Sequence, residues 1–239
     1  NQVDIGDANR IFNLWNLSRT DSTYARDADI NFDGVINSLD LGFVTKNFGN
    51  DGFGAPPVFK YIREGGDNSG AIARIEGLDD VEAWWPGRVF EVTARIEDLN
   101  DLAVFGMRVT YDPDKVAPLS GEKAVSQGNV FDENPEGSLF FHRHLPGAID
   151  VAAGRMGAAW TASGDADLAT FRFVTLTDDP GVVDIAYGEL GNSAHIGVPM
   201  QVAKAKALPL AAALHQNYPN PFNPSTEIRF DLLTARDVK

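Results

Sequence analysis

The stretch DINFDGVINSLD, residues 29–40, decides how the N-terminal part of this chain folds. Oxygen-bearing side chains stand at loop positions one, three, five, nine and twelve, which are Asp29, Asn31, Asp33, Asn37 and Asp40. Gly34 stands at position six, where a sharp turn favours glycine. Val35 at position seven can offer only its backbone carbonyl. Because calcium takes about six to eight oxygen ligands from such a loop, the stretch predicts a calcium site. The alternative is a surface turn of Asp, Asn and Gly that holds no metal.

The second half of this loop recurs at the N-terminus, at a shift of 36 residues. NQVDIG at residues 1–6 overlays NSLDLG at residues 37–42, so Asn1 and Asp4 correspond to positions nine and twelve. The chain therefore opens inside a second copy of the loop, and we expect a fragment or a processed form. Asn1 and Asp4 alone cannot hold calcium, so they are weaker candidates than the complete loop.

Two units of calcium loop and helix, spaced in this way, resemble a dockerin domain over residues 1–50. The aspartate at position twelve fits that family better than the glutamate of ordinary EF-hands. The resemblance implies one helix after each loop and docking onto a cohesin domain. It maps the partner-contacting positions ten and eleven onto Ser38 and Leu39, and onto Gln2 and Val3. Many dockerins carry a hydroxyl pair at these positions, and this chain does not. Its two faces also differ from each other, which argues against symmetric two-way binding. The alternative role of Val3 and Leu39 is to pack the two helices together.

Composition narrows the class of protein. The 239 residues carry a formal net charge of −14, which argues against nucleic acid and anionic membranes as partners. No apolar run approaches the roughly 20 residues that span a membrane. Cysteine is absent, so disulfides are excluded, although bacterial exported proteins can do without them. An acidic chain with a calcium loop suits a calcium-rich extracellular medium.

Apolar spacing predicts two helices and a linker. Residues 3–16 read as a helix with an apolar set of Val3, Ile5, Ile11, Phe12 and Trp15. Residues 38–48 read as a second helix, with Leu41, Val44 and Phe48 inward. Gly and Pro in residues 51–57 mark a linker.

Between residues 58 and 205 the pattern changes to a period of two. RVFEVTARI (88–96) and FGMRVTY (105–111) alternate in this way, and SLFFHRH, LATFRFVTL and VVDIAY follow as further short runs. Many short strands without a long helical stretch predict an antiparallel two-sheet sandwich. The predicted fold class is therefore mainly β, with a small α-helical calcium-loop module at the N-terminus.

The order of motifs in this region resembles a cohesin domain. ARIEDLNDLAVFGMRVTYDPDKV (94–116) has a strand followed by a YDP turn, and GAAWTASG and LATFRFVTL come later. The resemblance implies a sandwich that binds dockerins through one sheet face and has no catalytic apparatus. Because YDP also occurs in carbohydrate-binding sandwiches, another sandwich remains the alternative.

Residues 206–213 read as a second linker, and residues 214–239 form a distinct tail. NYPNPFNPSTEIRF (217–230) carries prolines that prevent a helix. The string resembles the opening of the C-terminal sorting domain of bacterial type IX secretion, which implies an export address that stops here after its first strand. The alternative is a proline-rich linker.

Other candidate sites are sparse. Trp84 and Trp85 are adjacent, so on a strand one could stack on a sugar ring while the other enters the core. The simpler alternative is one core and one edge tryptophan. His142 and His144 share a strand face but lack an evident third zinc ligand. No nucleophile elbow, phosphate loop or dinucleotide turn is present, so we expect no enzyme.

The sequence thus predicts a non-catalytic, secreted or cell-surface bacterial assembly protein with calcium as cofactor. Its partners would be cohesin or dockerin modules of other copies or other proteins. A chain with both halves of such a pair could assemble head to tail into filaments, or dock its own module intramolecularly. The alternative is a carbohydrate-binding sandwich from a larger glycan-degrading secreted protein, with polysaccharide as ligand.

Overall fold

The structure is a computed structural model that describes most of the chain. It covers residues 2–50, 68–78, 84–121, 124–157 and 160–203, and the backbone of two short strands. Those strands, β11 (Ala213–Leu214) and β12 (Phe230–Asp231), pair antiparallel with each other. The predicted linker at 51–57 and most of the predicted linker and tail at 206–239 lie outside the described residues.

The two helices are shorter than predicted and begin at clear caps. The first, α1, spans Ile5–Asn13, and α2 spans Ser38–Lys46. Each N-terminus carries a capping box, from Asp4 and Asp7 in α1 and from Asn37 and Asp40 in α2. Each side chain of a capping box bonds a backbone N–H that the first helical turn leaves unpaired, which sets where the helix begins.

Helix α1 buries a narrower face than the apolar pattern predicts. Ile11, Phe12 and Trp15 are buried as expected, whereas Ile5 is 48% exposed and the prediction for it was wrong. Ala8 takes the inward place one turn later. Of the residues predicted inward in α2, Leu41 and Val44 are buried and Phe48, which follows the helix, is half-buried.

The remaining described elements are strands, so the fold is mainly β as predicted. They are β1 (Ile72–Glu76), β2 (Val89–Thr110), β3 (Val116–Pro118), β4 (Val125–Gln127), β5 (Ser138–Leu145), β6 (Ala148–Arg155), β7 (Ala162–Thr175), β8 (Asp184–Asn192), β9 (Gly197–Pro199) and β10 (Gln201–Val202). All pairs among them are antiparallel except β1 with β10, which is parallel.

Strand β2 connects the two layers of the sandwich, which therefore form one hydrogen-bonded network. The runs 88–96 and 105–111, predicted as separate strands, are the two halves of β2. The first half pairs with β1 and β7, and β7 also pairs with β3 and β4. The second half pairs with β6 and β8, extended by β5 and β9. Between the halves, Asp98 and Asp101 have positive φ and the register shifts, so the strand bends from one layer to the other.

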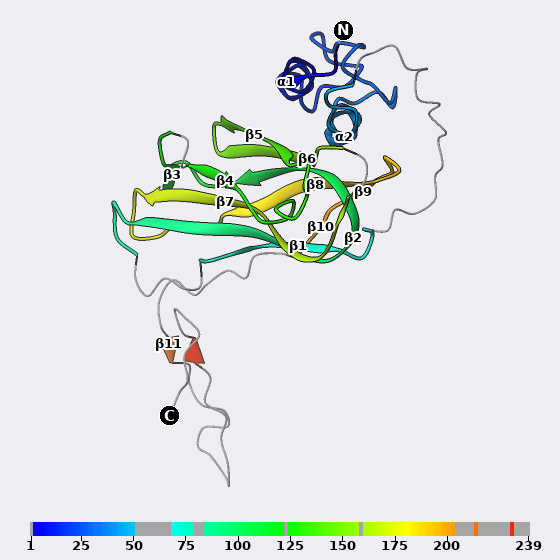
Figure 1. The fold of residues 1–239 in the computed structure, drawn as a ribbon. Coiled ribbons are helices and arrows are strands. Elements are labelled where there is room, and N and C mark those ends of the chain that lie inside the picture. Colours follow the sequence, from blue (N-terminus) through cyan, green and yellow to red (C-terminus); the bar gives the residue numbers. More distant parts are fainter. Residues whose placement is uncertain are drawn as a thin grey trace, which may run out of the picture.

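The main core lies between these layers. Phe90, Val92 and Ile96 from the first half of β2 join Phe105 and Met107 from the second half. Successive strand residues point to opposite sides, so the sequence neighbours of these core residues face outward. In the second layer outward residues such as Val104 and Ala152 are buried, because α1 and α2 lie over this side (Figure 1). A second apolar cluster joins α1 and α2 to Val104 of β2 and Ala152 of β6.

Candidate docking face and calcium loop

The loop at residues 29–40 folds around its glycine as the pattern predicted. Gly34 has a φ of 99°, in the left-handed region that favours glycine. Its backbone N–H donates across the turn to Asp29 Oδ2 at 3.0 Å. The segment before the loop ties it down, since Arg19 N–H donates to the Gly34 carbonyl at 3.0 Å and Ile36 N–H to the Leu17 carbonyl at 2.9 Å.

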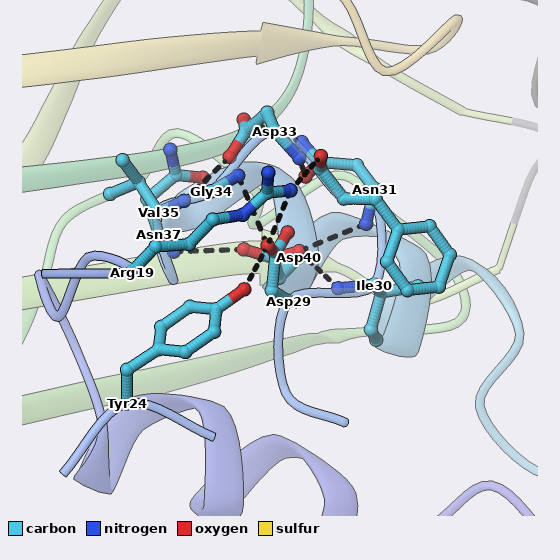
Figure 2. A network of polar contacts seen from close by, with 11 residues as sticks. Arg19, Tyr24, Asp29, Ile30, Asn31, Asp33, Gly34, Val35, Asn37 and Asp40 are labelled. Atoms are coloured by element: carbon cyan, nitrogen blue, oxygen red, sulfur yellow. Dashed lines mark hydrogen bonds and ion pairs between the residues drawn. The ribbon is translucent and has the colours of Figure 1, made fainter. Parts of the chain in front are cut away.

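The two ends of the loop meet at buried carboxylates (Figure 2). Asp40 Oδ1 accepts the N–H groups of Ile30 at 2.6 Å and Asn31 at 3.2 Å, and its Oδ2 accepts that of Asn37 at 2.9 Å. Burial raises the pKa of Asp40 to about 7, against the opposing effect of these three donors. The loop thus removes a carboxylate from water and holds it in place with backbone donors.

The donor set at this loop fits a calcium ion. Asp29 Oδ2 accepts from Gly34 N–H and the Tyr24 hydroxyl, but its buried Oδ1 has no hydrogen-bond partner in the described part of the chain. Leaving such an oxygen unsatisfied costs about 1–3 kcal/mol, which a bound cation would offset. The described carboxylates and histidines do not by themselves form a metal-binding group of three or more. A calcium ion would therefore also need amide oxygens and the Val35 carbonyl, which are ligands that this cation accepts.

Asn31 and Asp33 shape the loop between these ends. Asn31 Oδ1 accepts from Asp33 N–H at 3.0 Å, and Asp33 Oδ1 accepts from Val35 N–H at 2.9 Å. Arg19 crosses the loop, donating to the Phe32 carbonyl at 2.6 Å with its guanidinium 3.8 Å from Asp29 Oδ2 (Figure 2). Side chains of both charges therefore surround this turn.

The partial copy of the loop at the N-terminus makes different contacts. Asn1 lies outside the described residues, and Asp4 caps α1 by accepting Gly6 N–H at 2.7 Å. Gln2 donates its amide to the Gly49 carbonyl at 2.6 Å, and Val3 exchanges backbone hydrogen bonds with Gly49 and Asn50. Gln2 and Val3 thus join the start of the module to the segment that follows α2.

The outer side of the second sandwich layer carries this module, and we call it the docking face. Its defining residues alternate with core residues along β2, β5, β6 and β8, and they are Gly106, Arg143, Gly154, Tyr187, Glu189 and Gly191. In Figure 1, α2 lies directly above this layer, and it contacts β2, β6 and β8.

Helix α2 meets the docking face through its first turn. The Ser38 hydroxyl donates to Glu189 Oε2 at 2.7 Å, and Ser38 is fully buried. Leu39 lies so close to Gly191 and Gly197 that a Cβ added to either glycine would come within 3.0 Å of its methyl carbons. Ser38 and Leu39, two of the four residues that the dockerin resemblance maps to partner contact, are therefore in contact with the sandwich.

The C-terminal end of α2 adds two further contacts. Thr45 lies over Gly154, where an added Cβ would come 2.9 Å from Thr45 Oγ1. Phe43 stacks on His195, with ring centroids 3.9 Å apart and planes inclined by 16°. Burial lowers the pKa of His195 to about 4, helped by the positive charges of Lys46 and Arg155.

The end of α1 contacts the same face. The Trp15 ring covers Gly106, and Asn16 Nδ2 donates to the Tyr187 hydroxyl at 2.6 Å. Arg143 Nη2 donates to the Trp15 carbonyl at 3.3 Å while also binding the fully buried Asp150 at 2.8 Å. Helix α2 and the segment after α1 therefore both make polar and apolar contacts with one sheet.

The predicted sugar-stacking tryptophans lie elsewhere on the sandwich. Trp84 packs edge-on against Phe90, at a centroid distance of 4.9 Å, and borders the main core. Trp85 is 51% exposed, and the Arg88 guanidinium lies 4.4 Å from its ring centroid. One tryptophan thus packs inward and its neighbour outward.

Sequence reasoning missed the sandwich side of the docking face. Glu189, Arg143 and Tyr187 belong to strands whose outward residues look like ordinary solvent-facing positions. A usable signal was glycine within strands, at Gly106, Gly154 and Gly191, because a strand glycine often marks close approach of another backbone.

Comparison with known proteins gave a family match for the N-terminal part of the chain. The family model for the dockerin type I domain matches residues 1–49. A search of the curated proteins found no match. No helix in the described part of the chain is long and apolar enough to cross a membrane.

Among solved structures, the chain is similar to a type II cohesin domain from the cellulosome of Acetivibrio cellulolyticus, with 11% identity, a TM-score of 0.47, and coverage of 56% of this chain and 92% of that one. It is also similar to the type II cohesin A11 from Bacteroides cellulosolvens, with 10% identity, a TM-score of 0.48, and coverage of 57% and 96%. A non-cellulosomal cohesin from the archaeon Archaeoglobus fulgidus has 18% identity, a TM-score of 0.40, and coverage of 55% and 83%. These values are too low to support an inference about partners.

Proposed function

We propose that this chain is a non-catalytic docking protein of the cohesin/dockerin kind, stabilised by calcium and working outside the cell. The observation that carries the proposal is the position of the N-terminal module. It matches a dockerin family, and it rests on a sheet face of the same chain through Ser38 and Leu39. An apolar cluster shared by the two parts, with hydrogen bonds at Ser38 of α2 and at Trp15 and Asn16 after α1, supports a defined contact.

Calcium would be held by the loop at residues 29–40. The ligands would be side-chain oxygens of Asp29, Asn31, Asp33, Asn37 and Asp40 with the Val35 carbonyl, and Asn1 and Asp4 are weaker candidates. When bound, the ion would neutralise the carboxylates that the loop buries. Ligands that repel one another without the ion couple folding of the module to binding.

A single thiol can report on docking, because the natural chain has no cysteine. Thr45 is 1% exposed and lies over Gly154, so a Thr45→Cys thiol should react slowly with a labelling reagent while the module is docked. Chelator should accelerate labelling strongly and leave an Ala94→Cys thiol in the sandwich core protected. Unchanged labelling of Thr45→Cys with chelator, together with unchanged calorimetric stability, would show that calcium does not stabilise docking.

The same contact can join two copies. If the module of one copy docks on the face of the next, the contact is heterologous and leads to filaments unless it closes into a ring. In a single chain the closed form competes, because a short connection gives an effective concentration of about millimolar. We therefore infer a closed monomer at micromolar concentration and head-to-tail assembly only well above it.

Light scattering across a concentration series tests this assembly. Growth of the mean mass towards millimolar chain in calcium, and its loss in Leu39→Ala, would support exchange between copies. A monomer at every concentration, with Thr45→Cys still protected, would leave the closed form as the functional state and remove the filament.

Extracellular location is supported by residues 217–230, which resemble the start of a type IX sorting domain. Fusion of this chain, carrying its native flanking sequence, to a reporter in a bacterium with that pathway should give export, and loss of export on deleting residues 217–239. Retention of export after the deletion would refute the proposal that residues 217–239 carry an export signal.

Carbohydrate binding is the second candidate, and Trp85 is the observation that favours it. Trp85 is 51% exposed on the sandwich, although Arg88 lies over its ring. Retardation of the chain in gels containing soluble polysaccharide, abolished by Trp85→Ala, would establish it. Equal mobility with and without glycan would remove it.

A further inference from the structure

The sandwich surface beneath the N-terminal module carries glycine at four positions where a larger residue would meet the module. Gly106, Gly154, Gly191 and Gly197 all lie where a Cβ would come within 3.0 Å of a side chain from the N-terminal module. None of the four has a positive φ, so their backbone conformations do not require glycine. The absence of side chains matters here because it lets the helix approach the sheet.

One acidic side chain, that of Glu189, lies among these glycines. Glu189 is the carboxylate that accepts the Ser38 hydroxyl, and its Oε1 would lie 2.9 Å from a Cβ on Gly197. Burial raises the pKa of Glu189, while the Ser38 hydrogen bond favours its ionised form. A buried carboxylate that loses its donor is costly, so this position requires a hydroxyl or another donor from the docked helix.

We propose that Gly154, Gly191 and Gly197, together with Glu189, are specificity determinants that select a docking helix with a small hydroxyl residue at position 38 and a leucine at position 39. This inference rests on the proposed docking function and names the partner chemistry of the same face. The glycines set how close the helix lies, and Glu189 sets which residue its first turn must carry.

The first repeat of the chain does not meet this requirement. At the shift of 36 residues, Gln2 corresponds to Ser38, Asp7 to Phe43 and Asn9 to Thr45. Gln2 would put a longer amide side chain where the small Ser38 is fully buried against Glu189, and Asp7 would place a carboxylate where Phe43 stacks on His195. The face therefore accepts the module through α2 and excludes the arrangement in which the two repeats exchange places.

A double-mutant cycle between Gly197 of the sandwich and Leu39 of the module tests the role of the glycines. In the Thr45→Cys reporter, Gly197→Ala should accelerate labelling roughly tenfold, because the added methyl meets Leu39. In a Leu39→Ala background the added methyl no longer meets a module side chain, although Glu189 Oε1 stays 2.9 Å from it, so Gly197→Ala should accelerate labelling by much less than this tenfold. Gly70→Ala is the matched control, since a Cβ there meets nothing within 4 Å.

Substitution of Ser38 tests the acidic determinant. Ser38→Thr keeps the hydroxyl and should retain most protection, whereas Ser38→Ala should accelerate labelling and Ser38→Gln should accelerate it further. Equal effects of Gly197→Ala in both backgrounds, or equal protection in Ser38→Ala and Ser38→Gln, would overturn the inference. If the unsubstituted reporter is labelled as fast as a free thiol, docking itself fails, which is a distinguishable result.

Discussion

Truncation of Leu39 should open the closed form without unfolding either part. The Leu39 side chain is 8% exposed and meets Gly191 and Gly197 of the sandwich, and it is not among the residues that pack inside the module. Undocking would leave it on the surface of α2. Leu39→Ala therefore removes apolar contact that exists only in the docked state.

The magnitude follows from the cost of deleting a buried leucine. Large-to-small changes of this kind cost about 2–5 kcal/mol, and an edge position between two glycines belongs near the lower end, at about 2–3 kcal/mol. Since about 1.4 kcal/mol is a factor of ten, the opening equilibrium should shift roughly 30- to 140-fold. Labelling of Thr45→Cys should accelerate by the same factor when opening and closing are fast.

The assay needs a reporter for unfolding of the module itself. Ala28 is 1% exposed inside the module, so an Ala28→Cys thiol should keep its protection in Leu39→Ala. Ile5→Ala, at a position that is 48% exposed, should leave both reporters unchanged. The reasoning is refuted if Leu39→Ala accelerates Thr45→Cys less than about threefold, or accelerates Ala28→Cys equally, since Leu39 would then stabilise the module and not the contact.

Three further outcomes follow from the same contacts. Asp150→Asn should lower the free energy of unfolding of the whole chain by about 3–5 kcal/mol in urea denaturation, because a fully buried carboxylate binds both Arg108 and Arg143; a loss below 1 kcal/mol would contradict this. Gly34→Ala should weaken calcium binding by at least about tenfold in calorimetry, because φ of 99° strains any residue with a Cβ; unchanged affinity would mean that the turn is not needed. In the docked form burial, with the positive charges of Lys46 and Arg155, lowers the pKa of His195 from the ordinary 6.5 to about 4, so the contribution of neutral His195 is present above about pH 6.5 and lost as the pH falls; where undocking restores the ordinary pKa, opening should increase by up to roughly 30-fold at pH 5. The raised pKa of Glu189 would change the opening equilibrium in the opposite direction, so the pH series should be measured in Glu189→Gln, with labelling rates normalised to a free thiol at each pH. The double variant Glu189→Gln with His195→Phe should lose the pH dependence. Persistence of the pH dependence in that double variant would assign it to another group.

The turn of the loop at residues 29–40 and the existence of the two helices could be predicted because they depend on local spacing. Asp29, Gly34 and Asp40 lie in one loop of twelve residues, and the hydrogen-bond partners cited here are three to ten residues away in sequence. The alternation in residues 88–96 and 105–111 likewise indicated strands, although it did not show that Asp98 and Asp101 keep both runs in one bent strand. Helix ends shifted by a few residues because capping residues, and not the apolar pattern, set where α1 begins.

By itself, the sequence determined the loop with its oxygen-bearing side chains, the repeat behind it, and the two-residue period of a sandwich. Only the tertiary structure decided which sheet face receives the module, because that face assembles residues from β2, β5, β6 and β8 that are far apart in the chain. A strand pattern shows that residues alternate between two sides, but it does not show what covers each side. Glu189 and Gly191 could have faced solvent, and they form a docking face because α2 lies against them.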